Sequence, residues 1–143
     1  MAAFSQWGGA VLCGVALLVP LPHPVTVTCT LVAPDSARRG HEVPIVLRLA
    51  NTGKAPENLY LTGRTITFDI IVARADGQVV WRRLEHETGQ QVLQVKTLAP
   101  GETLELRDAW RALVDPGAYT VTGIIPTDRQ PLRTAPVRLR ITP

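Results

Sequence analysis

Apolar and polar side chains alternate in short runs through most of the chain, which is the period of half-buried β-strands. Gly, Pro, Asn and Asp interrupt these runs about every 8–12 residues, as in β-sandwich sequences. No stretch of the sequence combines sustained helical periodicity with helix caps. Strands are predicted over residues 25–33, 43–49, 58–61, 65–74, 79–84, 92–98, 103–107, 119–125 and 137–141.

This arrangement predicts an all-β fold, an immunoglobulin-like antiparallel β-sandwich of about eight strands. The motif Asp115-x-Gly117-x-Tyr119 is similar to the corner at which a tyrosine hydroxyl bonds to nearby backbone in that fold. A closed β-barrel has the same periodicity and stays open as the alternative. Gly123 is expected to bend or bulge the strand that contains it.

The segment 64–83 predicts a β-hairpin. Asp76-Gly77 suits a two-residue type I′ turn, because both central residues of that turn need positive φ. The resulting register pairs Val72 with Trp81 and places one apolar face inward. That face consists of Ile66, Phe68, Ile70, Val72, Val79 and Trp81, with Val79 paired to Arg74.

The other face of the hairpin is polar. Asp69 lies opposite Leu84 and diagonal to Arg82 in the predicted register, and a cross-strand ion pair is expected there. Both Trp81 and Trp110 lie in strand-like segments, where a tryptophan is usually part of the core. Neither tryptophan is expected to serve as a ligand platform.

The bulk composition narrows the class of protein. The chain has 143 residues, which suits one domain, and its 45% apolar and 19% charged residues indicate a globular protein. The formal net charge is +3, and the arginines are scattered without interleaved aromatic residues. We therefore expect a solvated surface and no binding of nucleic acid.

The N-terminal region differs from the rest. Residues 1–22 carry no charge, and residues 8–21 form a nearly continuous apolar run. Its length fits the hydrophobic region of a signal peptide and is short for a membrane span. We therefore divide the chain into a signal or anchor segment, 1–23, and a β-sandwich domain, 24–143. No basic residue precedes the run and no clear cleavage site follows it, so a mis-assigned start or an apolar arm packed on the domain stays open.

Few side chains have the setting that nucleophilic catalysis requires. Ser5 lies in the N-terminal segment and Ser36 in a turn, and neither belongs to a nucleophile-elbow motif. Cys29 is in phase with inward apolar residues, where a thiolate is disfavoured. Together with Cys13 it forms neither a disulfide framework nor a zinc motif.

The histidines His23, His41 and His86 are isolated from one another. His86 lies between Glu85 and Glu87, which resembles a metal-binding pattern. Adjacent strand residues point to opposite faces, however, so a solvated polar loop is the favoured interpretation.

Carboxylates are few. Asp69 and Asp108 lie in strand-like segments, and we expect each to pair with a neighbouring arginine rather than to perform acid–base catalysis. The sequence therefore indicates a binding or structural domain and not an enzyme. It predicts no catalytic residue, no metal and no cofactor.

From about residue 51 to residue 121 the chain resembles the BsuPI family of intracellular proteinase inhibitors. The matching residues are Asn51, Gly53, Phe68-Asp69-Ile70, Val72, Asp76-Gly77, Val80-Trp81-Arg82, Leu98-Ala99-Pro100-Gly101-Glu102-Thr103, Trp110, Pro116-Gly117 and Tyr119-Thr120-Val121. The resemblance implies an immunoglobulin-like sandwich and inhibition of a subtilisin-like serine protease. The matched residues are mostly turn and core positions, so no protease-binding residue is carried over.

We therefore expect a protein-binding domain similar to a subtilisin-type serine proteinase inhibitor. The loops 85–91 and 127–135 are the candidates for the protease contact. A non-inhibitory immunoglobulin-like interaction module of the cell envelope is the alternative. The family resemblance favours a cytoplasmic location, whereas the apolar N-terminus favours export or anchoring in the envelope.

Overall fold

The computed structural model describes residues 26–85 and 92–143. Over these residues it contains strands and no helix, so the all-β prediction is confirmed, and no helix of this part of the chain could span a membrane. The strands are β1 (Val27–Val32), β2 (Ser36–Arg38), β3 (Glu42–Asn51), β4 (Glu57–Thr62), β5 (Asp69–Arg74), β6 (Val79–Arg82), β7 (Leu93–Leu98), β8 (Thr103–Arg111), β9 (Gly117–Ile125), β10 (Leu132–Arg133) and β11 (Val137–Thr142).

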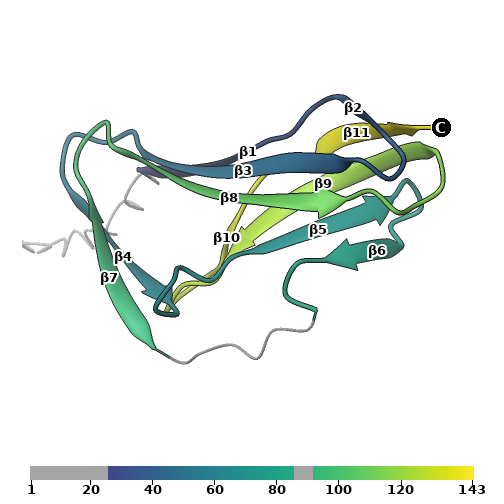
Figure 1. The fold of residues 1–143 in the computed structure, drawn as a ribbon. Helices are drawn as coiled ribbons and strands as arrows, with labels where there is room; N and C mark the ends of the chain where they lie inside the picture. The colour runs from purple at the N-terminus through teal and green to yellow at the C-terminus, as the bar shows by residue number, and fades with distance from the viewer. Residues whose placement is uncertain (1–25, 86–91) are drawn as a thin grey trace, which may run out of the picture.

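Two sheets pack face to face (Figure 1). One sheet has the order β1-β3-β8, and the other has the order β2-β11-β9-β5-β6, with β10 also paired to β9. The pairs are antiparallel except for β11 with β2. Neither sheet closes on itself, so the immunoglobulin-like sandwich is confirmed and the barrel alternative is wrong. A separate two-stranded sheet, β4-β7, lies at one end of the sandwich (Figure 1).

The core lies between the two large sheets and follows the alternation of the sequence. In β3 every second residue from Val43 to Leu49 is fully buried, while the residues between them face outward. The facing sheet contributes Ile70 and Val72 from β5 and Val121 from β9. This interdigitation removes the apolar faces of both sheets from water, which is the main favourable term in folding.

The predicted hairpin is present but begins later in the chain. Residues 63–66 form a turn in which Thr67 N donates a hydrogen bond to Thr62 O, and the strand begins only at Asp69. Within the hairpin Val72 pairs with Trp81 as predicted. Phe68, although it precedes the strand, is buried as expected.

The turn of the hairpin differs from the predicted type I′ turn. Arg74 N donates to Gln78 O, and Gly77 N donates to Arg74 O, so three residues rather than two form the loop. Gly77 has a φ of 89°, whereas Asp76 does not have positive φ. This is a type I turn followed by a left-handed glycine. The Asp76 side chain accepts a hydrogen bond from Gln78 N at 2.9 Å, which stabilises this alternative.

The longer loop shifts the register by one residue. Ala73 therefore pairs with Val79, and Val80 forms a bulge that restores the predicted pairing at Val72 and Trp81. Val79 is 47% exposed as a result, so its predicted inward position and its pairing with Arg74 are wrong. Val80 packs against the core instead.

Gly123 does not bend or bulge its strand, because β5 and β9 pair in unbroken register across it. A Cβ atom at this position would lie 2.6 Å from Leu47 Cδ2. The glycine therefore permits close approach of the two sheets. Two short strands, β2 and β10, lie in segments predicted to be a turn and a loop, and each pairs along only a few residues.

The hairpin turn gives the first prediction. Replacing Gly77 with Val should lower the free energy of unfolding by about 1–3 kcal/mol, because a β-branched residue is strained at positive φ. The space around Gly77 is open, so no steric contact contributes to this loss. Urea unfolding measures it. Gly77→Asn is the matched control, because asparagine tolerates this conformation, and equal stability of the two variants would contradict the turn described here.

Candidate functional site

The side chains considered for catalysis or metal binding lie on separate elements. Ser36 is on β2, His41 is in the turn before β3, and Cys29 is on β1. Burial raises the pKa of the Cys29 thiol to about 11, so little reactive thiolate forms near neutral pH. Among residues 26–85 and 92–143, no group of three His, Cys, Asp or Glu side chains could hold a metal ion. The other such residues lie outside the described residues: Ser5, Cys13, His23, His86 and Glu87.

The two aspartates pair with arginines, as predicted. Asp69 accepts a hydrogen bond from Arg82 Nη2 at 2.7 Å and another from Leu84 N at 3.2 Å. Asp108 accepts from Arg83 Nε at 2.5 Å. The Arg83 guanidinium also donates to Phe68 O at 2.8 Å and lies 3.9 Å from the centroid of the Phe68 ring. These contacts join the end of β6 to β5 and β8.

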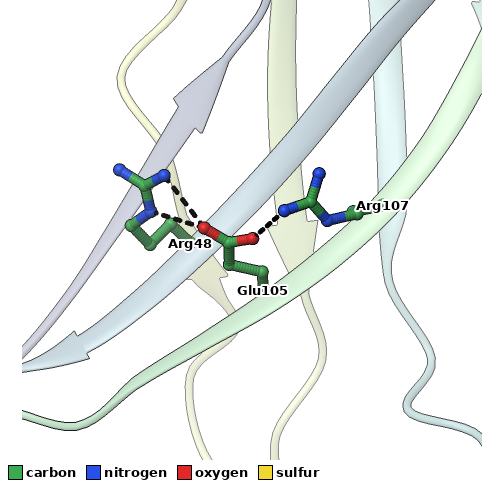
Figure 2. Close-up of polar contacts among 3 residues, drawn as sticks. All are labelled: Arg48, Glu105 and Arg107. Atoms are coloured by element: carbon green, nitrogen blue, oxygen red, sulfur yellow. Dashed lines mark hydrogen bonds and ion pairs between the residues drawn. The ribbon is translucent and has the colours of Figure 1, made fainter.

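The outer face of β3 and β8 carries an ionic cluster (Figure 2). Arg48 donates to one Glu105 oxygen at 2.9 Å and Arg107 donates to the other. Both arginines hold the pKa of the Glu105 carboxyl below its usual range. Each charge has a partner on the same exposed face, so the cluster belongs to a solvated surface and stabilises the fold little.

A groove opens between β6 and β8, the edge strands of the two large sheets. Trp81 of β6 and Trp110 of β8 stack across it with their ring centroids 6.0 Å apart. Trp110 is buried and Trp81 is half-buried, so the stack closes the core and also forms the floor of the groove. The lining continues onto Leu113 and Val114 in the loop after β8.

The loop 112–116, between β8 and β9, presents one apolar side chain to solvent. Leu113 is 71% exposed, the largest fraction among the exposed large apolar residues of the described chain. Residues Trp110 and Ala112, on either side of the strand end, are buried. Leu113 therefore continues the alternation of β8 and points outward, whereas Trp110 and Ala112 point inward.

The backbone of this loop is held at both ends. Ala112 N donates to His41 O at 3.0 Å, and Ala112 O accepts from Gly40 N at 2.9 Å. At the other end the Tyr119 hydroxyl donates to Asp115 O at 2.5 Å, which confirms the predicted tyrosine corner. Leu113 thus lies on a short segment fixed by main-chain and side-chain hydrogen bonds.

The sequence alone does not identify this loop as a candidate site. The alternation pattern nevertheless contains a clue to it. Leu113 has the outward phase directly before a turn, whereas the inward phase is occupied by Leu104, Leu106, Trp110 and Ala112. An exposed leucine at a strand end is common, so only the hydrogen bonds around it set it apart.

The sequence favours two other loops, 85–91 and 127–135, as candidates for the protease contact. Residues 86–91 lie outside the described residues, so the prediction for 85–91 stays a prediction. In the loop 127–135 the Thr127 hydroxyl accepts from Arg129 N and donates to Gln130 O. Its exposed tip, 128–131, carries polar side chains and a proline and no large apolar group. The large exposed apolar side chain lies at Leu113 and not in this tip, and the prediction for the loop 127–135 stays a prediction.

A family model described as intracellular proteinase inhibitor, BsuPI, matches residues 31–130. The chain belongs to this family. Membership supports a proteinase-inhibitor-like domain whose partner is a protease, and a binding role rather than a catalytic one. The groove is lined by Val80, Trp81 and Trp110, three of the residues that carry the family resemblance.

Several solved structures are similar to this chain at low sequence identity. The C-terminal domain of wzt is 11% identical, with a TM-score of 0.56 over 82% of this chain and 74% of that chain. The CARDB domain of PF1109 from Pyrococcus furiosus is 12% identical, with a TM-score of 0.47 over 82% and 94% of the two chains. A β-glucosidase from Listeria innocua is 8% identical, with a TM-score of 0.47, and only 16% of its length is covered. None of the curated proteins matches the chain. Of these three, only the wzt domain has a TM-score above 0.5, and at 11% identity it indicates a fold and not a function.

The tyrosine corner gives the second prediction. Replacing Tyr119 with Phe should lower the free energy of unfolding by about 0.5–1.5 kcal/mol, because Asp115 O loses its hydrogen-bond donor. Chemical denaturation measures this loss. Tyr60→Phe is the control, because Tyr60 is 43% exposed, and a similar loss in both variants would show that the corner is not a stabilising contact.

Proposed function

We propose that this BsuPI-family domain inhibits a serine protease of the subtilisin type by inserting Leu113 into the primary specificity pocket. The observation that carries the proposal is the combination of exposure and restraint in the loop 112–116. Leu113 extends into solvent, while the backbone on both sides of it is held by hydrogen bonds. A protease whose primary pocket is apolar would accept this side chain.

Restraint of the loop favours tight binding. A flexible loop loses conformational freedom when a protease immobilises it, whereas a loop that is already ordered avoids that loss. The corner at Tyr119 and the contacts of Ala112 supply this order before binding. Protease–inhibitor pairs generally associate with little backbone movement, which fits such a loop.

The groove between β6 and β8 supplies the rest of the surface for the proposed contact with the protease. A protease–inhibitor interface buries about 800 Å² on each partner, more than one leucine provides. Val80, Trp81 and Val114 adjoin Leu113 in the same groove, and they offer an apolar surface to the rim of the protease cleft. Aromatic residues of this kind are frequent in the buried centres of interfaces.

The apolar N-terminal segment supports a proposed location of the domain outside the cytoplasm. Residues 1–23 act as a signal or anchor, and residues 24–143 form the inhibitory domain outside the cytoplasm. The uncharged sequence of residues 1–22 supports this division. The protease would then be one that the domain meets in the envelope.

The third prediction tests the contact. The full chain is titrated against subtilisin, and hydrolysis of a chromogenic peptide is followed. Leu113→Ala should raise the inhibition constant about 30-fold or more, the effect of removing an interface hot spot of about 2 kcal/mol. Leu93→Ala is the matched control, since this leucine is also exposed but lies on β7 at the opposite end. The control should inhibit like the unchanged chain.

Each other outcome has a distinct meaning. If both leucine variants inhibit like the unchanged chain, the protease contact lies elsewhere and the role of Leu113 is wrong. If the unchanged chain does not slow subtilisin at micromolar concentration, or is digested by it, the assignment of subtilisin as target is wrong. A non-inhibitory interaction module of the envelope would then be the better description.

A further inference from the structure

The outer face of the two-stranded sheet β4-β7 carries three exposed apolar side chains, next to the polar pair Asn58 and Thr97 at one end. Leu93 is 63% exposed, Val95 is 57% exposed, and Tyr60, directly opposite Val95, is 43% exposed. The other face of the same sheet contributes Leu61 and Leu98 to the core. Several exposed apolar side chains on one small surface usually mark a site of contact with a protein or a membrane.

The N-terminal segment joins the domain beside this sheet. Thr26, the first described residue, donates a hydrogen bond from its hydroxyl to Glu57, the first residue of β4, at 2.5 Å. Thr26 O also accepts from Thr52 N at 2.7 Å, so the junction is fixed to the domain. Tyr60 lies three residues further along β4, which is about 10 Å at the rise of a strand.

The length of chain between the junction and the apolar run restricts where the domain can lie. Thr26 lies five positions after Leu21, the last residue of the apolar run, and five residues extend over at most about 18 Å. If the run 8–21 is held in a bilayer, Thr26 must therefore lie close to the lipid surface. The apolar face of β4-β7 would be brought to the same surface.

We propose that the Tyr60, Leu93 and Val95 face of β4-β7 rests on the lipid bilayer when residues 1–23 anchor the chain. Tyrosine is favoured at the boundary between headgroups and hydrocarbon, and shallow insertion buries the exposed leucine and valine. The basic residues Lys54 and Arg64 lie in the turns at the two ends of β4, where each can approach lipid phosphates.

This orientation places the loop 112–116 away from the bilayer. Figure 1 shows the β8–β9 connection at one end of the sandwich and β4-β7 at the other. The membrane contact does not depend on inhibition of a protease, and the two faces can be tested separately.

The fourth prediction uses an environment-sensitive fluorescent label on the full chain. Cys13→Ser and Cys29→Ala remove the native thiols, and a single new cysteine is placed by Leu93→Cys or, as control, by Leu113→Cys. The chains are reconstituted in vesicles of phosphatidylcholine and phosphatidylglycerol. The label at position 93 should shift its emission to shorter wavelength in the vesicles, whereas the label at 113 should keep the emission of an aqueous site.

A second pair of variants tests the face itself. Val95→Glu should abolish most of the shift at position 93, because a charge opposes burial in lipid. Val32→Glu, at an exposed valine on β1, should leave the shift unchanged.

Three results would overturn the proposal. Equal emission from positions 93 and 113 would show that the face stays in water. A shift already present without vesicles would show that the chain's own N-terminal segment covers the face. A shift that disappears when protein is diluted at constant lipid would show that a second copy covers it.

Discussion

The close approach of Leu47 to Gly123 is the contact on which the sandwich depends. Leu47 is fully buried at the centre of β3, and the position that a Cβ of residue 123 would occupy is 2.6 Å from its side chain. β9 therefore needs a glycine there to remain a straight central strand between β5 and β11. The Gly123 N–H donates a hydrogen bond to the Thr134 hydroxyl at 2.9 Å. This hydrogen bond also fixes the segment that carries β10 to β9.

The edges of the two sheets are joined by side chains rather than by backbone. Trp81 stacks on Trp110, and Arg83 links Asp108 to the Phe68 carbonyl, so β6 and β8 are held together although they belong to different sheets. Such contacts cover the open side of the sandwich and leave a shallow groove above the rings. The groove is thus a consequence of how the fold closes its core, which is why core residues also line the proposed interface.

Period-2 alternation predicts the all-β class and the inward faces, because one face of each long strand must be buried. It does not separate a sandwich from a barrel, which the sheet order decides. It identified the inward set of β3 and the pairing of Val72 with Trp81. It failed where a local hydrogen bond selected the structure, since the Asp76 side chain favours a three-residue loop and forces Val80 to bulge. The strands β2 and β10 were missed for a related reason: each pairs over two or three residues, too few to produce a pattern.

The proposed site could not be predicted in the same way. Leu113 differs from an ordinary exposed leucine only through contacts made by distant residues, among them His41 O on Ala112 and the Tyr119 hydroxyl on Asp115 O. The tyrosine corner was visible in the sequence, but its consequence for the preceding loop was not. In this fold the corner stabilises the start of β9 and at the same time restrains the loop before it. A stabilising feature of the sandwich therefore also supplies rigidity to this loop, and in the proposed inhibitor a single hydroxyl would link stability to binding.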